Sequence, residues 1–157
     1  MSKKTKRIYV DSTVVSGMFD YHMPERVEQA KLFWDAMQRG DFVVIASDVL
    51  DEEQEDAPQH TRDFFASLPQ TQIERVVSTN ESDQLAMRYI TENVIGTSSL
   101  DDCRHIAVAT IASADAIVSW NLRDMVNRHE KYKSVNKMLG YAEIEIITPD
   151  RFMEDKS

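Results

Sequence analysis

The chain has 157 residues, of which 42% are hydrophobic and 29% charged, and its formal net charge is −9 at pH 7. This length fits one domain, and the proportions are ordinary for a globular protein rather than a disordered one. The acidic balance argues against a protein that coats DNA or RNA by charge alone, because neutralising phosphates takes an excess of basic residues. It leaves room for a nuclease, since a carboxylate cluster loaded with divalent cations attracts RNA.

The sequence also bears on where the protein works. No apolar run approaches the roughly 20 residues that a membrane-spanning helix requires. The basic start, Met1 to Arg7, precedes only a short apolar stretch and does not resemble a secretory signal. Cys103 is the only cysteine, which excludes an internal disulfide and indicates a reducing compartment. We therefore predict a cytoplasmic protein without membrane contact, consisting of a single domain over residues 1–157 with its core at about 7–150.

The first half of the chain alternates between strand and helix patterns. Arg7–Val10 is a short β-rich run that ends at Asp11. Pro24 opens a helical stretch with an apolar stripe, and Gly40 ends it. Phe42–Ala46 is continuously apolar, which is typical of a strand buried on both faces.

The same alternation continues to the end of the chain. A polar helix begins after Ser47 and breaks at Pro58, and Asn80 is placed to cap a helix whose inner stripe is Leu85, Tyr89 and Ile90. The other expected elements are helices at Arg62–Leu68 and Leu100–Ser113 and strands at Ile73–Val77, Ala116–Ser119 and Glu143–Ile147. Strands that alternate with helices predict a parallel sheet covered on both faces. In such sheets functional groups gather at the carboxyl ends of the strands.

Asp11 ends the first strand, where a carboxylate points into the crevice above the sheet. It is equally suited to cap a helix, as is Thr13 two residues later. A dinucleotide-binding turn is excluded because the first glycine is Gly17, and a dehalogenase-type phosphatase would need an Asp where Thr13 stands. A receiver domain would need paired acids here and a lysine after the last strand, and both are missing.

The acidic run after Ser47 contains the second candidate. Most of its acids suit a solvated face, favoured by the dipole at the helix start. Glu53 differs because it shares a helical stripe with Val49 and Leu50, and a carboxylate on an apolar stripe is costly without a compensating charge. Glu52 or Asp56 would take its place if the helix were rotated.

Asp102 begins a helix on its buried side and is the third candidate, whereas the neighbouring Asp101 suits an N-cap. His105 lies one turn further and can hydrogen-bond a carboxylate, although a lone histidine is more often structural. Cys103 is most simply a small core residue. After the fourth strand, Asn121 faces Asp11 across adjacent strands.

Asp124 lies three residues beyond Asn121 and can add a carboxylate. Either residue is also suited to capping the turn that follows the strand. The conjunction of acidic and amide groups after several strands indicates one shared crevice better than any single residue does.

These segments, in this order and spacing from about Ile8 to Pro149, resemble the PIN-domain family. The similarity is greatest to the branch of VapC-type toxins of bacterial toxin–antitoxin pairs. The residues that carry it are Asp11-Ser12-Thr13 after a strand, Ser47 with Glu53 six residues later, Asp102-Cys103-Arg104-His105-Ile106-Ala107, and Ser119-Trp120-Asn121.

The resemblance implies a three-layer α/β/α sandwich with a five-stranded parallel sheet ordered 3-2-1-4-5. It implies that Asp11, Glu53 and Asp102 are metal-binding acids. The family often has Asp where this chain has Asn121, whose carbonyl oxygen can still serve a metal or a water but brings no charge. The resemblance also implies a homodimer and an antitoxin protein whose tail occupies the acidic groove.

Hydrolysis of an RNA phosphodiester needs a nucleophilic water and relief of charge on the phosphoryl oxygens. Oxygen ligands select Mg²⁺ or Mn²⁺, which supply both. We expect Asp11 and Asp102 to hold the main ion, Glu53 to hold or orient the attacking water, and Asn121 to help through a water. Thr13 is expected to place a hydroxyl near the scissile phosphate.

Two further expectations concern substrate and activity. Candidate RNA contacts are Arg62, Arg104, Arg123 and Arg128, although arginines on helices are more often simply solvated. The alternative to a metal-dependent endoribonuclease is a catalytically weak or inactive PIN-fold module that acts through protein or RNA binding. The amide at Asn121 and the acidic net charge favour that alternative.

Overall fold

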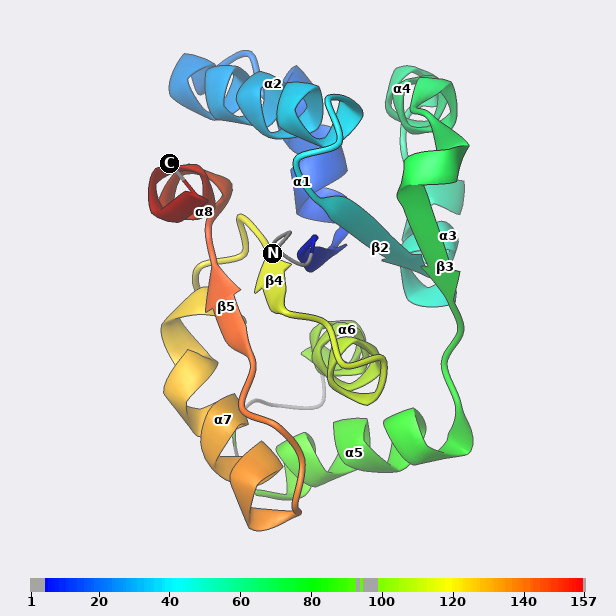
Figure 1. The fold of residues 1–157 in the computed structure, drawn as a ribbon. Helices are drawn as coiled ribbons and strands as arrows, with labels where there is room; N and C mark the ends of the chain where they lie inside the picture. The colour runs from blue at the N-terminus through cyan, green and yellow to red at the C-terminus, as the bar shows by residue number, and fades with distance from the viewer. Residues whose placement is uncertain (1–4, 93, 95–98, 157) are drawn as a thin grey trace.

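The computed structural model describes residues 5–92, 94 and 99–156. Its helices and strands, in chain order, are β1 (Arg7–Val10), α1 (Ser12–Ser16), α2 (Pro24–Gln38), β2 (Val43–Ser47), α3 (Asp48–Glu55), α4 (Gln59–Ser67), β3 (Ile73–Val76), α5 (Asn80–Thr91), α6 (Leu100–Ile111), β4 (Ala116–Val118), α7 (His129–Met138), β5 (Glu145–Ile147) and α8 (Pro149–Lys156) (Figure 1). None of the helices in this part of the chain combines the length and apolar character that crossing a bilayer requires.

The five strands form one parallel sheet in the order β3-β2-β1-β4-β5, as predicted. Helices α2 and α8 cover one face, and α5, α6 and α7 cover the other (Figure 1). The molecule is therefore the expected three-layer α/β/α sandwich. Because all strands are parallel, their carboxyl ends lie along one edge, where α1 and α3 begin directly after β1 and β2.

Most predicted elements are found within a few residues of their expected bounds, and one cap was wrong. The helix α5 is capped by Thr79 rather than Asn80: the Thr79 hydroxyl accepts from the Ser82 amide at 3.1 Å, and the Ser82 hydroxyl accepts from the Thr79 amide at 2.8 Å. This reciprocal pair satisfies two amides at once, which a cap at Asn80 would not do. Gly40 ends α2 as expected, with a φ of 87° that favours glycine.

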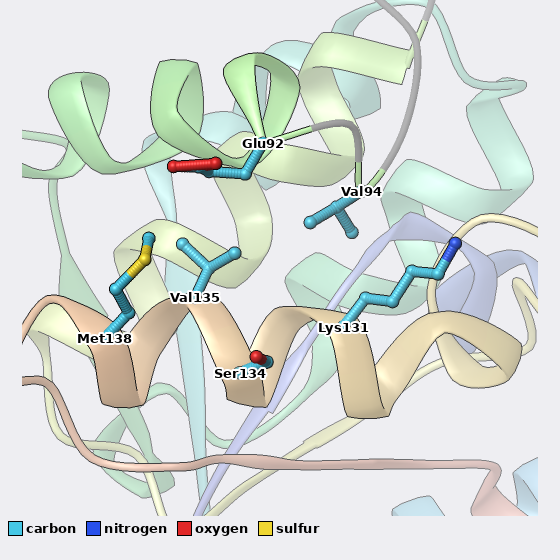
Figure 2. Close-up of a pocket in the computed structure, with 6 residues that line it drawn as sticks. All are labelled: Glu92, Val94, Lys131, Ser134, Val135 and Met138. Carbon is cyan, nitrogen blue, oxygen red and sulfur yellow. The ribbon is translucent and has the colours of Figure 1, made fainter.

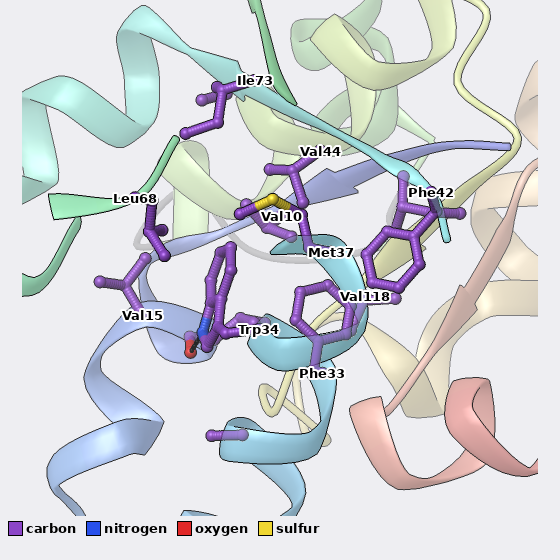
Figure 3. Close-up of a cluster of buried hydrophobic side chains, with 14 of the residues drawn as sticks. Val10, Val15, Phe33, Trp34, Met37, Phe42, Val44, Leu68, Ile73 and Val118 are labelled. Carbon is purple, nitrogen blue, oxygen red and sulfur yellow. Dashed lines mark hydrogen bonds between the residues drawn. The ribbon is translucent and has the colours of Figure 1, made fainter. Parts of the chain in front are cut away.

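The face under α2 and α8 is packed with aromatic side chains (Figure 3). The Phe33 ring lies 5.0 Å from the Trp34 ring and 4.9 Å from the Phe42 ring, between centroids. Phe152 of α8 completes the group, beyond the predicted core limit, at 5.1 Å from Phe42. The Trp34 indole N–H donates to the Val14 carbonyl at 3.2 Å, so even this polar group is satisfied.

The face under α5, α6 and α7 encloses polar side chains among its apolar ones. The Tyr89 hydroxyl donates to the Asn136 side-chain oxygen at 2.5 Å, and the Asn136 amide nitrogen donates to Thr110 and to the Ala142 carbonyl, both at 3.1 Å. Buried polar groups are tolerated when they are paired in this way. A second polar group on this face, around Tyr9 and His105, leads to the candidate site.

Candidate active site

Asp11 stands where β1 ends and α1 begins, and it caps that helix, one of the two roles that the sequence suggested for it. It caps α1, with its Oδ1 accepting from the Thr13 amide at 3.1 Å and from the Thr13 hydroxyl at 2.6 Å. Its Oδ2 accepts from the Ser119 hydroxyl at 2.6 Å. The residue is only 3% exposed. Burial raises the pKa of the Asp11 carboxyl, although nearby His105 and the hydrogen bonds from Ser119 and Thr13 partly offset that rise.

The two side chains that hold Asp11 also join the loop after β4 to the loop after β1. The Thr13 hydroxyl accepts from the Trp120 amide at 2.8 Å, and the Ser119 hydroxyl accepts from the Asn121 amide at 2.9 Å. The Thr13 hydroxyl proton is thus directed at Asp11, and the predicted contact of this hydroxyl with a phosphate stays a prediction. The sequence pattern assigned no role to Ser119 beyond its place in a motif. Its position at the end of the strand beside β1 could have marked it as a neighbour of Asp11.

Asp102 lies in the first turn of α6, near Asp11 and the loop after β4. Its Oδ1 accepts from the Asn121 side-chain amide at 3.2 Å. Partial burial, then the charges of Asp124, Asp11 and Glu53, raise the pKa of Asp102 to about 6. Carboxylates that far apart in the chain raise one another's pKa only when they are close in space, so this region concentrates negative charge.

Glu53 is the acid of α3 that faces the site. Its Oε1 contacts His105 Nε2 at 2.6 Å, with 25% of its side chain exposed. Glu52 instead pairs with Arg104 at 2.8 Å on the surface, and Asp56 is exposed. The helix is therefore not rotated toward either alternative.

His105 makes the hydrogen bond to a carboxylate that the sequence allowed for it. It is 1% exposed and lies between the Glu53 carboxylate and the Tyr9 hydroxyl, which is 2.7 Å from Nδ1. The Tyr9 hydroxyl lies 2.6 Å from the Ser47 hydroxyl. Burial lowers the pKa of His105, but the hydrogen bond and charge of Glu53, with the other nearby carboxylates, outweigh it and raise the pKa above its ordinary value.

The donor set suits a hard divalent cation, because it consists of carboxylate, amide and hydroxyl oxygens. These donors are not preassembled into a metal site. In residues 5–92, 94 and 99–156, no three His, Cys, Asp or Glu side chains lie close enough together to hold a metal ion. Asp11 is held by Thr13 and Ser119, and Glu53 is held by His105. A cation would have to close the remaining gaps.

Asn121 connects two of the acids. Its amide nitrogen donates to Asp102, and its Oδ1 accepts from the Asp124 backbone amide at 3.1 Å. Asn121 therefore orients the Asp102 carboxylate directly. Asp124, weighed as an extra carboxylate, lies near enough to raise the pKa of Asp102.

The four candidate RNA arginines differ in their contacts. Arg104 is held by Glu52 and Asp101, and Arg128 donates to the Val94 carbonyl at 2.8 Å. The Arg123 side chain is 90% exposed. Arg62 donates to the Gln59 side chain on the surface.

Arg26 was not anticipated among the basic residues near the site. Its guanidinium lies 5.0 Å from the centre of the Trp120 ring, next to the site loop. Cys103 is fully buried, and burial raises the pKa of its thiol to about 11, so it is a core residue rather than a nucleophile.

A hollow of about 400 Å³ lies elsewhere, between α5 and α7. Figure 2 shows Val135 and Met138 of α7 beneath Glu92 at the end of α5, with Lys131 further along the helix. One acid and one lysine do not make a metal-binding set. The chemistry of the molecule is concentrated instead at the carboxyl ends of β1 and β4.

Comparisons with known proteins agree with the fold. No family model and no curated protein matches the sequence. Among solved structures, the chain is similar to one in the crystal structure of VapBC2 from Rickettsia felis bound to a DNA fragment from their promoter. The two share 13% sequence identity with a TM-score of 0.54, over 90% of this chain and 98% of that one. At this identity the likeness shows the α/β fold alone.

Proposed function

We propose that this protein is a metal-dependent endoribonuclease of the PIN-domain family, acting in the cytoplasm as the toxin of a toxin–antitoxin pair. The observation that carries the proposal is the pair of carboxylates at Asp11 and Asp102. Asp11 is buried and Asp102 partly buried, both have a raised pKa, and neither has a cationic side chain as a direct hydrogen-bond partner among the described contacts. Ionised carboxylates in such a place favour a divalent cation.

The roles follow from the contacts of each side chain. Asp11 and Asp102 would hold Mg²⁺ or Mn²⁺, and Asn121 restrains the Asp102 carboxylate by a hydrogen bond. When bound, the ion would lower the pKa of a water and offset charge on the phosphoryl group. Glu53 contacts His105 through Oε1, and we assign its other oxygen to the attacking water.

Thr13 and Ser119 keep Asp11 in place, and we retain the prediction that Thr13 lies near the scissile phosphate. A partner antitoxin is supported by the similarity to a chain of the VapBC2 complex. A homodimer is part of the same proposal, and sedimentation of the purified protein tests it.

The test is cleavage of a labelled single-stranded RNA with Mg²⁺ or Mn²⁺, with and without EDTA. We expect cleavage by the natural protein, none with EDTA, and a loss on the order of 100-fold or more in Asp11→Asn. The asparagine keeps an oxygen for Thr13 and offers its nitrogen to Ser119, so circular dichroism should show an intact fold. Asp83→Asn, an exposed acid of α5, is the matched control and should cut normally. Full activity in Asp11→Asn refutes the proposal.

The second candidate is a PIN-fold module that binds but does not cut. Two observations favour it: the amide at Asn121 in place of a fourth acid, and the absence of a gathered three-ligand set in the described residues. It predicts RNA or protein binding that is unchanged by EDTA, with no cleavage at any metal concentration. The same assay separates the two candidates.

A further inference from the structure

A buried line of side chains connects Glu53 to the sheet. Glu53 Oε1 lies 2.6 Å from His105 Nε2, and His105 Nδ1 lies 2.7 Å from the Tyr9 hydroxyl. The Tyr9 hydroxyl lies 2.6 Å from the Ser47 hydroxyl, which accepts from the Leu50 amide at 3.3 Å. Tyr9 and Ser47 are fully buried and His105 is 1% exposed, so bulk water does not compete for these bonds.

One assignment of protons satisfies every member of the line. An ionised Glu53 only accepts, so His105 Nε2 must carry a hydrogen and donate to it. With a neutral ring, Nδ1 then accepts from Tyr9, and Tyr9 accepts in turn from Ser47. All of the hydrogen bonds run in one direction, from the Leu50 amide to the Glu53 carboxylate.

The two ends of this hydrogen-bonded line, Ser47 and Glu53, are also joined through the backbone of α3. Ser47 is the N-cap of α3, and Glu53 lies six residues along the same helix. The circuit therefore runs from Ser47 along α3 to Glu53, across to His105 of α6, to Tyr9 of β1 and back to Ser47 at the end of β2. Four elements fix the position of one carboxylate.

We propose that His105 and Tyr9 are positioning residues, which hold the Glu53 carboxylate in the rotamer that it has here, near Asp11 and Asp102. A glutamate has three rotatable bonds and, when it is partly exposed, samples several rotamers unless a partner restrains it. Groups that bind a ligand or a water gain most when they are held in place beforehand. The inference rests on the proposed function only for its consequence, since the positioning itself is a property of the chain.

Two amide substitutions of His105 remove its two hydrogen bonds one at a time. Glutamine places its amide nitrogen near the position of Nε2, so His105→Gln keeps the bond to Glu53. Asparagine reaches only the position of Nδ1, so His105→Asn keeps Tyr9 and releases Glu53. Tyr9→Phe removes the hydroxyl alone, and Tyr89→Phe is its matched control, because it removes a buried hydroxyl from the same face outside the line.

The readouts are the Glu53 rotamer in crystal structures of these variants and the Mn²⁺ dissociation constant by calorimetry. We expect His105→Asn and Tyr9→Phe to release Glu53 and weaken Mn²⁺ binding by about 10- to 100-fold, as is usual when the partners of a ligand are lost. His105→Gln keeps the bond to Glu53 but loses the one to Tyr9, so it should weaken Mn²⁺ binding less than His105→Asn does. Tyr89→Phe should lower the melting temperature and leave Mn²⁺ binding unchanged.

The outcomes separate this inference from the proposed function. If Glu53 keeps its rotamer in His105→Asn and Tyr9→Phe, the positioning role is refuted, whatever the metal does. If the natural protein binds no Mn²⁺ but Glu53 is released in those two variants, the nuclease proposal fails and the positioning role stands. Equal loss of Mn²⁺ binding in Tyr89→Phe would show a general loosening of the fold and would overturn the inference.

Discussion

The two faces of the sheet carry different kinds of side chain, although both belong to the same strands. In β1, Ile8 and Val10 point into the aromatic face under α2 and α8, while Tyr9 between them points into the face under α5, α6 and α7. The first face holds rings packed on rings; the second holds hydroxyl, imidazole and amide groups in hydrogen bonds. Because side chains alternate along a strand, one sheet can present an aromatic core on one face and a hydrogen-bonded polar group on the other.

Removing the largest ring of the aromatic face should have the largest effect on stability. Trp34 is 1% exposed, and Trp34→Ala should lower the free energy of unfolding by about 3–5 kcal/mol. Urea denaturation measures this change. Metal-dependent cleavage per folded molecule, at low temperature, should stay within about twofold of the natural protein. A large loss of activity in the folded variant would show that the aromatic face also contributes to cleavage, and would contradict this separation of the two faces.

The opposite pattern is expected at the carboxyl edge. Asp102→Asn should lower cleavage on the order of 100-fold, because a metal-holding acid is lost. It should leave the melting temperature of the metal-free protein unchanged or slightly higher, since it removes a charge that its neighbours disfavour. Cleavage assays test the expected loss of activity, and thermal melts test the expected stability. A clear fall in melting temperature would contradict this account.

An acid in place of Asn121 should raise the affinity for metal and lower the stability of the metal-free protein. In Asn121→Asp, an amide that donates to Asp102 becomes a carboxylate that repels it. We expect Mn²⁺ to bind about tenfold more tightly and the metal-free protein to melt at a lower temperature. Asn127→Asp, an adjacent surface change, serves as the control. Weaker metal binding in Asn121→Asp would mean that Asn121 lies outside the ligand set.

The smallest effect concerns pH. The raised pKa of His105 stabilises the fold while the ring is protonated, and this contribution is lost as the pH rises through the folded-state pKa. Asp102, at about 6 against an ordinary 3.8, binds its proton more tightly when folded, so its contribution is lost between those values as the pH rises. Both shifts make the metal-free protein more stable at about pH 5.5 than at about pH 8.

The pH comparison is chosen to exclude other acids. Glu52 and Glu74 have lowered pKa values, so the stability that they contribute is lost only at lower pH. Thermal melts of the metal-free protein at the two pH values, with Mn²⁺ added at the higher one, test the prediction. A melting temperature that is higher at about pH 8 without metal would contradict it.

Local patterns were enough to predict the sheet and the places of Asp11 and Asp102 in the fold. Asp11 follows a strand and Asp102 opens a buried helix, and each position can be recognised from a few neighbouring residues. The short helix α7 was not specified, because its polar residues leave few apolar positions to mark a stripe. The α4 helix begins at Gln59, three residues earlier than expected, directly after Pro58.

The line behind Glu53 was beyond sequence reasoning for a physical reason. Tyr9 and His105 are 96 positions apart, and each alone has the pattern of an ordinary core residue. Only the packing of α6 on β1 brings these two side chains into contact. Glu53 could be selected from its helical stripe, whereas the group that holds it could not.

The proposed function requires that Asp11, Asp102 and Glu53 bind a divalent cation. Calorimetric titration of the metal-free protein with Mn²⁺ at about pH 8, with Asp11→Asn and Asp83→Asn alongside, measures this binding. The account predicts saturable binding by the natural protein and by Asp83→Asn, and none by Asp11→Asn. No saturable heat from the natural protein, or equal heat from Asp11→Asn, would contradict it.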